Sequence, residues 1–262
     1  MHAFYFGSGT RRLFGVYEPS RLARAKPQAA LLCNPWGAEY LHAHKSLRQL
    51  AIRLAEAGVD TLRFDYFATG DSSGADGEGS LEDWRKDILM ATDELRSLSG
   101  ATRISLVGLR LGATLAAQAS LGMRKVVDKL VLWDPITDGG EYIEELYAAC
   151  RAPHLTIKEP IARSAEIGGG FDILGFPMTQ RIHGELNNLS IQAIASDLPG
   201  KVRTLISNGE ASAERARSAL IAAPAAVVEN MESLPIWFED WPRNSGVVPA
   251  RTLQQIVQWV AS

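Results

Sequence analysis

The chain has 262 residues, of which 46% are hydrophobic and 22% are charged. These values are typical of a soluble globular protein and exclude a disordered chain, a collagen-like chain and a coiled coil. Basic residues number 27 and acidic residues 30, so the formal net charge is -3 and no basic surface indicates nucleic acid as a partner.

The N-terminus and the cysteines indicate where the protein works. Residues 1–9 lack a charged segment followed by an apolar run, so we expect no signal peptide. The apolar runs fall far short of the ~20 residues that cross a bilayer, so we expect no membrane span. Cys33 and Cys150 are too few for a disulfide framework. These features predict a cytoplasmic protein.

Strand and helix patterns alternate along most of the chain. Two short aromatic runs around Gly7-Ser8-Gly9 predict a β-hairpin at the start. Further strands are expected at 29–33, 59–64, 103–108, 129–133, 202–207 and 226–229. Helices are expected around 47–54, 81–98, 111–121, 213–221 and 249–260, the second of them capped by Ser80. This alternation predicts an α/β fold with a mostly parallel sheet and helices on both faces.

Residues 139–198 interrupt the alternation. They contain helical patches at 141–151, 179–186 and 191–194, and no clear strand. We therefore expect a core built from 1–138 and 199–262, with a helical lid at 139–198. The run Gly168-Gly169-Gly170 is interpreted as a hinge of that lid.

The segment Gly108-Leu109-Arg110-Leu111-Gly112 lies between a predicted strand and a predicted helix. Hydrolases place the motif G-x-S-x-G in this context, where the glycines permit a sharp turn that presents the serine. Both glycines are present here, but the central residue is Arg110. A guanidinium stays protonated at pH 7, so Arg110 cannot attack a carbonyl group.

On these residues the chain resembles the α/β-hydrolase superfamily, and it is most similar to serine-aminopeptidase-like members, including hydrolase-like proteins found beside exosortase and biosynthetic gene clusters. Residues 30–37 resemble the strand that leads to the oxyanion loop. Residues 64–72 resemble the loop D-x-R-G-x-G-x-S, with Phe67 and Ala68 in place of Arg and Gly. The resemblance covers nearly the whole chain and implies an α/β-hydrolase fold. It also implies an oxyanion hole made by backbone N–H groups near Trp36 and Leu111.

The resemblance also shows which catalytic groups are lost. The acid of the triad is expected just after strand 202–207, where only Glu210 could serve. The histidine is expected in the loop 241–248, which contains none, and all five histidines lie at or before His183. His44 is the candidate base, provided that it faces the pocket.

Cofactor and metal signals are weak. His42 and His44 could bind a metal together, but no third ligand beyond the nearby Glu39 is evident, so we expect no metal. The chain has neither G-x-G-x-x-G in its first βα turn nor a phosphate-binding P-loop, so we expect no cofactor. Cys33 ends a buried strand and is expected to be a structural thiol. The aromatic segment 237–241 could pack on the core or form the rim of the pocket.

Two interpretations of Arg110 stay open. The N-terminus of the following helix favours an anion, and Arg110 adds a planar cation suited to carboxylate or phosphate. Alternatively, Arg110 pairs with an acid of the chain, such as Asp65, Asp71 or Asp134, and fills the former active site.

The first hypothesis for function is therefore a protein that lacks the serine and histidine machinery. It would bind a small acyl or carboxylate-bearing ligand as an accessory protein or a triad-free enzyme. The expected ligand-binding residues are Trp36, Gly37, Arg110, Leu111 and Asp134. One alternative is an active esterase or thioesterase with an unrecognised nucleophile. The other is a pseudoenzyme scaffold with a filled pocket, working with a protein partner or as a homo-oligomer.

Overall fold

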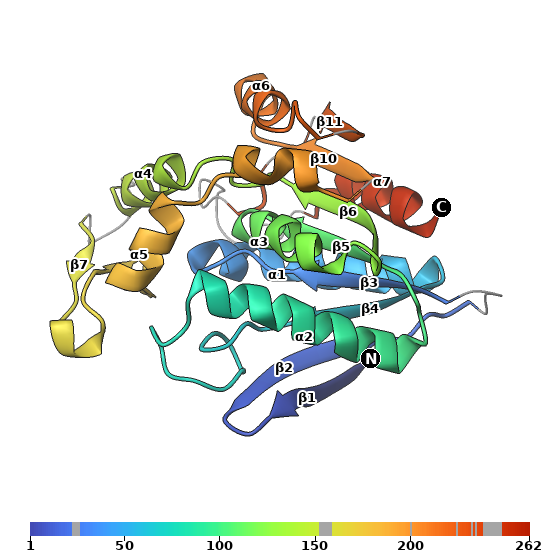
Figure 1. The fold of residues 1–262 in the computed structure, drawn as a ribbon, viewed down its shortest axis with the longest axis horizontal. Coiled ribbons are helices and arrows are strands. Elements are labelled where there is room, and N and C mark those ends of the chain that lie inside the picture. The colour runs from blue at the N-terminus through green and yellow to red at the C-terminus, as the bar shows by residue number, and fades with distance from the viewer. Residues whose placement is uncertain are drawn as a thin grey trace.

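An eight-stranded sheet forms the centre of the molecule (Figure 1). The computed structural model describes residues 1–22, 27–151, 159–199, 201–223, 225–231, 233, 235–237 and 248–262. The strand order is β1-β2-β4-β3-β5-β6-β10-β11. Their bounds are β1 His2–Ser8, β2 Arg11–Glu18, β3 Gln28–Cys33, β4 Val59–Phe64, β5 Ile104–Leu109, β6 Val127–Trp133, β10 Val202–Ile206 and β11 Ala226–Asn230.

The sheet is parallel except at one edge. Strand β2 runs antiparallel to both β1 and β4, and the remaining neighbours are parallel. The predicted hairpin and the predicted mostly parallel sheet are therefore confirmed. Every residue of β5 is buried, as expected for a strand covered on both faces.

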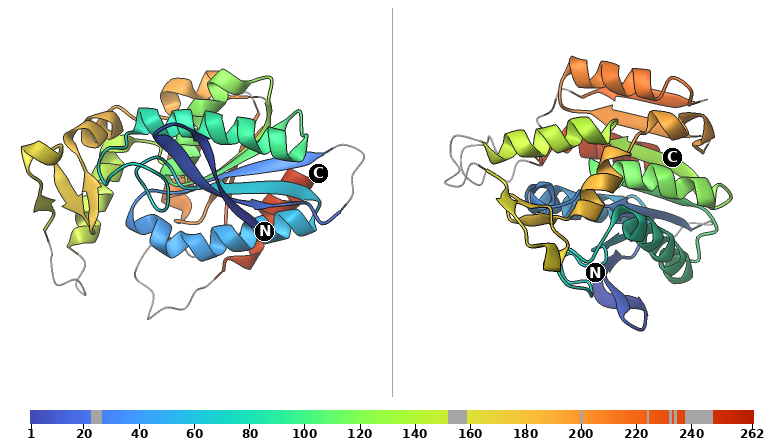
Figure 2. Two further views of the ribbon diagram at one scale, coloured as in Figure 1. Left: turned by 90° about the horizontal axis from the view of Figure 1, so that it is seen from below. Right: turned by 60° about the vertical axis from the view of Figure 1, so that its left-hand side comes forward.

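Helices cover both faces of this sheet. Helices α1 (Ala38–Glu56) and α7 (Ala250–Ala261) pack together on one face, and α2 (Leu81–Ser99) and α3 (Leu111–Ser120) on the other (Figure 2). Helix α6 (Glu210–Ala219) packs against β10 and β11, and a 3-10 turn, η1 (Leu121–Met123), follows α3. The predicted cap of α2 is confirmed, because Ser80 Oγ accepts a hydrogen bond of 3.1 Å from the Asp83 N–H.

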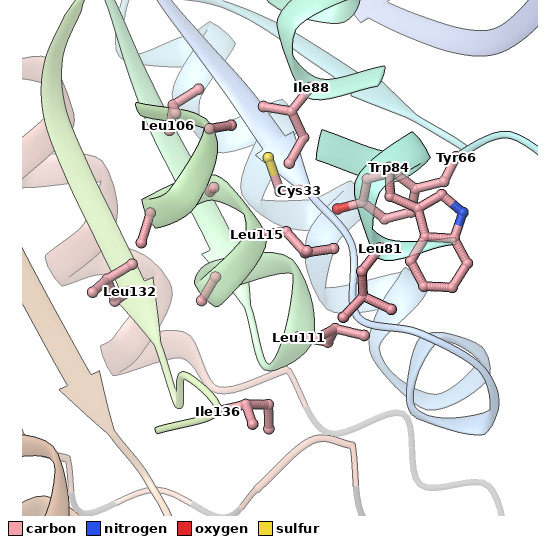
Figure 3. Close-up of a cluster of buried hydrophobic side chains, with 14 of the residues drawn as sticks. Cys33, Tyr66, Leu81, Trp84, Ile88, Leu106, Leu111, Leu115, Leu132 and Ile136 are labelled. Carbon is pink, nitrogen blue, oxygen red and sulfur yellow. The ribbon is translucent and has the colours of Figure 1, made fainter. Parts of the chain in front are cut away.

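The core between the sheet and helices α2 and α3 is apolar (Figure 3). Trp84 and Ile88 come from α2, and Leu111 and Leu115 from α3. Cys33 is fully buried in this cluster, and burial raises the pKa of its thiol, which suits the expected structural role.

Residues 139–187 lie beyond one end of the main sheet (Figure 1). The expectation that 139–198 has no strand is wrong, because this segment contains a second, three-stranded sheet. Its elements are α4 Gly139–Cys150, β7 Ile161–Ala162, η2 Ala165–Ile167, β8 Phe171–Ile173, β9 Phe176–Met178, α5 Gln180–Asn187 and η3 Gln192–Asp197. Across the described ranges, no helix combines the length and apolarity needed to span a bilayer.

Candidate functional site

Arg110 occupies the sharp turn between β5 and α3. Its φ of 52° and ψ of -124° lie in a region that residues with a Cβ rarely adopt. The flanking glycines permit this turn. A Cβ on Gly108 would lie 2.4 Å from Ala113 Cα, and one on Gly112 would lie 2.2 Å from the Asn34 carbonyl oxygen. The strained backbone of a nucleophile elbow is therefore present, with an arginine at its centre.

The Arg110 side chain is buried in a cage of acidic and aromatic groups. Its Nε donates to Glu39 Oε1 at 2.9 Å, and its Nη2 donates to Glu145 Oε2 at 2.5 Å. The guanidinium also lies 5.3 Å from the Tyr142 ring centroid and 4.9 Å from that of Trp237. Tyr142 Oη donates to the second oxygen of Glu39 at 3.0 Å. Both the guanidinium and the Glu39 carboxylate thus have hydrogen-bond partners inside the protein.

The acids expected from the sequence do not make these contacts. Glu39 belongs to the first turn of α1 and Glu145 to α4, whereas Asp65, Asp71 and Asp134 were the expected partners. Asp65 instead accepts hydrogen bonds from Tyr40 Oη at 3.1 Å and from the Asp71 N–H at 3.0 Å. The interpretation of Arg110 as paired with acids of the chain is correct, but the named acids were wrong.

Burial and charge act against each other in this cage. Burial disfavours the charged form of Arg110, but Glu39 and Glu145 outweigh it and raise the pKa of the guanidinium. Burial raises the pKa of Glu39, while Arg110 and Tyr142 act to lower it. One hydrogen bond from a permanent cation and one from a phenol act toward the ionised carboxylate.

A small cavity of about 30 Å³ adjoins the cage. Arg110, Tyr142 and Glu145 line it, together with Asp134 at the end of β6. A cavity of this size holds about two water molecules.

Asp134 is held by Ser207, the residue after β10. The Ser207 N–H donates to Asp134 Oδ1 at 2.7 Å and its Oγ donates to Oδ2 at 2.5 Å. Asp134 is 3% exposed, and burial raises its pKa from 3.8 to about 7, against the opposing effects of Ser207 and Arg110. The Ser207 hydroxyl therefore lies within hydrogen-bond reach of a carboxylate, the arrangement that an esterase with an unrecognised nucleophile would need.

The expected oxyanion groups lie beside the elbow and outside the lining of this cavity. Among the hydrogen bonds of the described residues, none is donated by the N–H groups of Trp36 or Leu111. Both residues are buried, and these two donors have no partner among the described residues. Gly37 lies next to β9, since a Cβ on it would be 3.5 Å from the Phe176 ring. The 139–198 segment therefore contacts the oxyanion loop.

His44 and Glu210 do not take the expected places. His44 is exposed on α1, where its Nδ1 lies 2.7 Å from the Leu41 carbonyl oxygen. Glu210 is exposed at the start of α6 and binds Arg217 and Asn230 at 2.6 and 2.7 Å. Neither residue lines the cavity at Arg110, so neither acts as base or acid there.

Some sequence expectations fall on residues that the structure does not describe. His154, residues 238–241 and the rest of the loop as far as 247 lie outside the described residues. Trp237, at the start of the aromatic segment, is described and stacks on Arg110. Within the described ranges no group of three histidine, cysteine or acidic side chains could hold a metal ion.

Solved structures provide the comparison with known proteins, since no protein-family profile and no curated protein matches the sequence. Est1E from Butyrivibrio proteoclasticus, with ferulic acid bound, is 16% identical at a TM-score of 0.66, over 99% of this chain and 96% of that one. Proline iminopeptidase from Mycobacterium smegmatis is 11% identical at a TM-score of 0.68, over 99% of this chain and 97% of that one. Mouse alpha/beta hydrolase domain-containing protein 10 is 16% identical at a TM-score of 0.63, over 99% of this chain and 97% of that one. Likeness at this level of identity concerns the fold, and the chain has the α/β-hydrolase fold.

Proposed function

We propose that this protein binds a small carboxylate-bearing acyl ligand at Arg110, without a serine nucleophile. The observation that carries the proposal is the unequal burial of the two carboxylates on the guanidinium. The Glu39 side chain is 9% exposed, whereas the Glu145 side chain is 47% exposed. Glu39 is a fixed part of the cage, and Glu145 occupies a position that opens to solvent.

A ligand carboxylate replaces Glu145 in this proposal. It accepts the same charge-assisted hydrogen bond from Arg110 Nη2, so the exchange keeps the buried cation paired. Glu145 is on α4, the first helix of the 139–198 segment. We further propose that 139–198 is a lid over this site.

The neighbouring groups suit an acyl compound. The unpaired N–H groups of Trp36 and Leu111 are donors for a carbonyl or carboxylate oxygen. Est1E was solved with ferulic acid, a carboxylic acid, which supports this class of ligand on the same fold. The missing serine and the missing histidine support binding without an acyl-enzyme on the elbow residue.

Isothermal titration with hexanoate and ferulate tests the proposal. Glu145→Gln removes the competing charge, and we expect its affinity to rise about tenfold, equivalent to about 1.4 kcal/mol. Glu144→Gln is the matched control, because Glu144 is the exposed neighbour on the same helix. Adding Arg110→Gln to Glu145→Gln is expected to abolish binding. Equal hexanoate affinity for the Glu145 and Glu144 variants, or binding that survives loss of Arg110, would refute the proposal.

A further inference from the structure

Two strained residues lie side by side at the carboxyl end of the sheet. Arg110 has a φ of 52° and Asp134 a φ of 45°, and both line the same cavity. They follow the neighbouring strands β5 and β6, and the Arg110 N–H donates to the Trp133 carbonyl oxygen at 2.9 Å. Backbone strain of this kind is found at functional sites, where the surrounding structure holds it in place. The binding proposal uses Arg110 but leaves Asp134 without a role.

The Asp134 carboxyl group is held in one position beside the cavity. Two hydrogen bonds from Ser207 fix both of its oxygens. Asp134 lines the cavity, whereas Ser207 is not among the lining residues. Its pKa of about 7 lets it gain or lose a proton near neutral pH. The charged side chains that line the same cavity are Arg110, Asp138, Glu141, Glu145 and Arg215.

We propose that Asp134 is a general base that activates a water molecule for direct attack on an acyl carbonyl bound at the elbow. This inference rests on the proposed function, because the acyl ligand occupies the same site. It adds an activity, the hydrolysis of an ester or thioester without a covalent intermediate. The cavity beside Asp134 has the volume for the water.

The reaction balances with water as the only co-reactant. The Asp134 carboxylate takes one proton from water while the water oxygen bonds to the carbonyl carbon. The carbonyl π electrons move to oxygen, and the Arg110 guanidinium, which lines the same cavity as Asp134, stabilises that negative charge. The tetrahedral species then breaks its bond to the alcohol or thiol, which leaves with the proton from Asp134. The other product is a carboxylic acid, which ionises to the ligand class proposed for Arg110.

Ser207 is a positioning residue in this scheme. Its Oγ and N–H both hold Asp134, and these hydrogen bonds lower the pKa of Asp134 against the effect of burial. The competing assignment makes Ser207 the nucleophile and Asp134 its base. The two assignments differ in whether an acyl group becomes attached to the protein.

Hydrolysis of p-nitrophenyl hexanoate between pH 5 and 9 tests the inference. We expect the wild-type rate to rise with pH through about 7, because the base must be ionised. Asp134→Asn is expected to lower the rate at least about 100-fold. Ser207→Ala keeps activity, and its pH–rate curve shifts to higher pH because a hydrogen bond to the carboxylate is lost. Glu144→Gln is the control, because Glu144 is exposed on α4 and does not line the cavity, and we expect no change.

Acid-quenched samples for intact-mass measurement complete the test. We expect no acyl adduct in the wild type. An adduct on Ser207 with an inactive Ser207→Ala variant would overturn the inference, as would an Asp134→Asn rate equal to that of the wild type. Should Asp134→Asn not fold, the Ser207→Ala profile and the mass measurement decide.

Hexanoate binding separates this inference from the proposed function. Arg110-dependent hexanoate binding by Glu145→Gln, with no hydrolysis by the wild type, overturns the inference and leaves the binding proposal intact. Hydrolysis that depends on Asp134, in a protein whose hexanoate binding does not depend on Arg110, overturns the binding proposal instead.

Discussion

Replacing Arg110 with methionine removes the cation on which the Glu39 carboxylate depends. The Arg110 and Glu39 side chains are 8% and 9% exposed, so the variant leaves an ionised group buried with only the Tyr142 hydroxyl as a partner. Breaking one side of a buried ion pair costs about 3–5 kcal/mol. The Glu145 half of the cage is 47% exposed, and its loss adds less than about 1 kcal/mol. We therefore expect Arg110→Met to destabilise the fold by about 3–5 kcal/mol.

A double-mutant cycle assigns this cost to the ion pair. Glu39→Gln keeps the shape and removes the charge, and it leaves Arg110 paired with Glu145, so we expect a loss of about 1–2 kcal/mol. The double variant carries no unpaired buried charge. We expect it to be more stable than Arg110→Met alone, with a coupling energy of about 2–3 kcal/mol.

Urea unfolding followed by tryptophan fluorescence measures each corner of the cycle at pH 8 and pH 5. The stranded Glu39 has a pKa above its unfolded value, so its protonated form stabilises the fold at low pH and this contribution is lost as pH rises. The loss in free energy of unfolding caused by Arg110→Met is thus expected to be smaller at pH 5 than at pH 8. An Arg110→Met loss below about 1 kcal/mol at pH 8, with no coupling energy to Glu39→Gln, would refute the role given to this ion pair.

Three further changes test other features of the fold. Gly112→Ala forces a Cβ to 2.2 Å from a backbone oxygen, so we expect it to lower the free energy of unfolding by at least about 2 kcal/mol. Gly184→Ala, in α5, meets no atom within 4 Å and should raise the free energy of unfolding by up to about 1 kcal/mol. Equal urea midpoints for the two variants would contradict this. Ser80→Ala removes the cap bond from Asp83 and should cost about 1 kcal/mol, and an unchanged midpoint would show that the cap contributes nothing. Folding raises the pKa of Asp134 from 3.8 to about 7, so its stabilising contribution is complete below pH 4 and is lost as pH rises through 7. We expect wild type to lose up to about 4 kcal/mol more than Asp134→Asn between pH 4 and pH 8, and parallel stability curves would contradict that.

The main sheet and its helices could be predicted because their patterns are local. The apolar run Val59–Phe64 and the three- and four-residue spacings of apolar residues in α2 can each be recognised within a short stretch of sequence. The small sheet was missed because its strands are only two or three residues long, too short for any alternation to register. The pairing of these strands depends on contacts between different segments, which the hydrophobic periodicity of one segment does not reveal.

The partners of Arg110 could not be found from spacing alone, since Glu39 and Glu145 are 71 and 35 residues away from it. One signal was present for Glu39. It lies four residues before Ala43 and eight before Leu47, on the buried face of α1. A glutamate on an apolar helix face needs a buried cation, and Arg110 is the cation at the neighbouring turn. His44 lies off the same face, which explains its exposure.

The arginine cage constrains whether a serine could replace Arg110 at the elbow. A single Arg110→Ser change would place a hydroxyl group on a backbone that already has the elbow conformation. It would also leave the buried Glu39 carboxylate without its cation, so the single variant is expected to fold less stably than this chain. Two positions that are far apart in the gene, 39 and 110, would therefore have to change together. The ion pair thus couples these two positions in sequence and disfavours a serine at the elbow, although the elbow backbone is present.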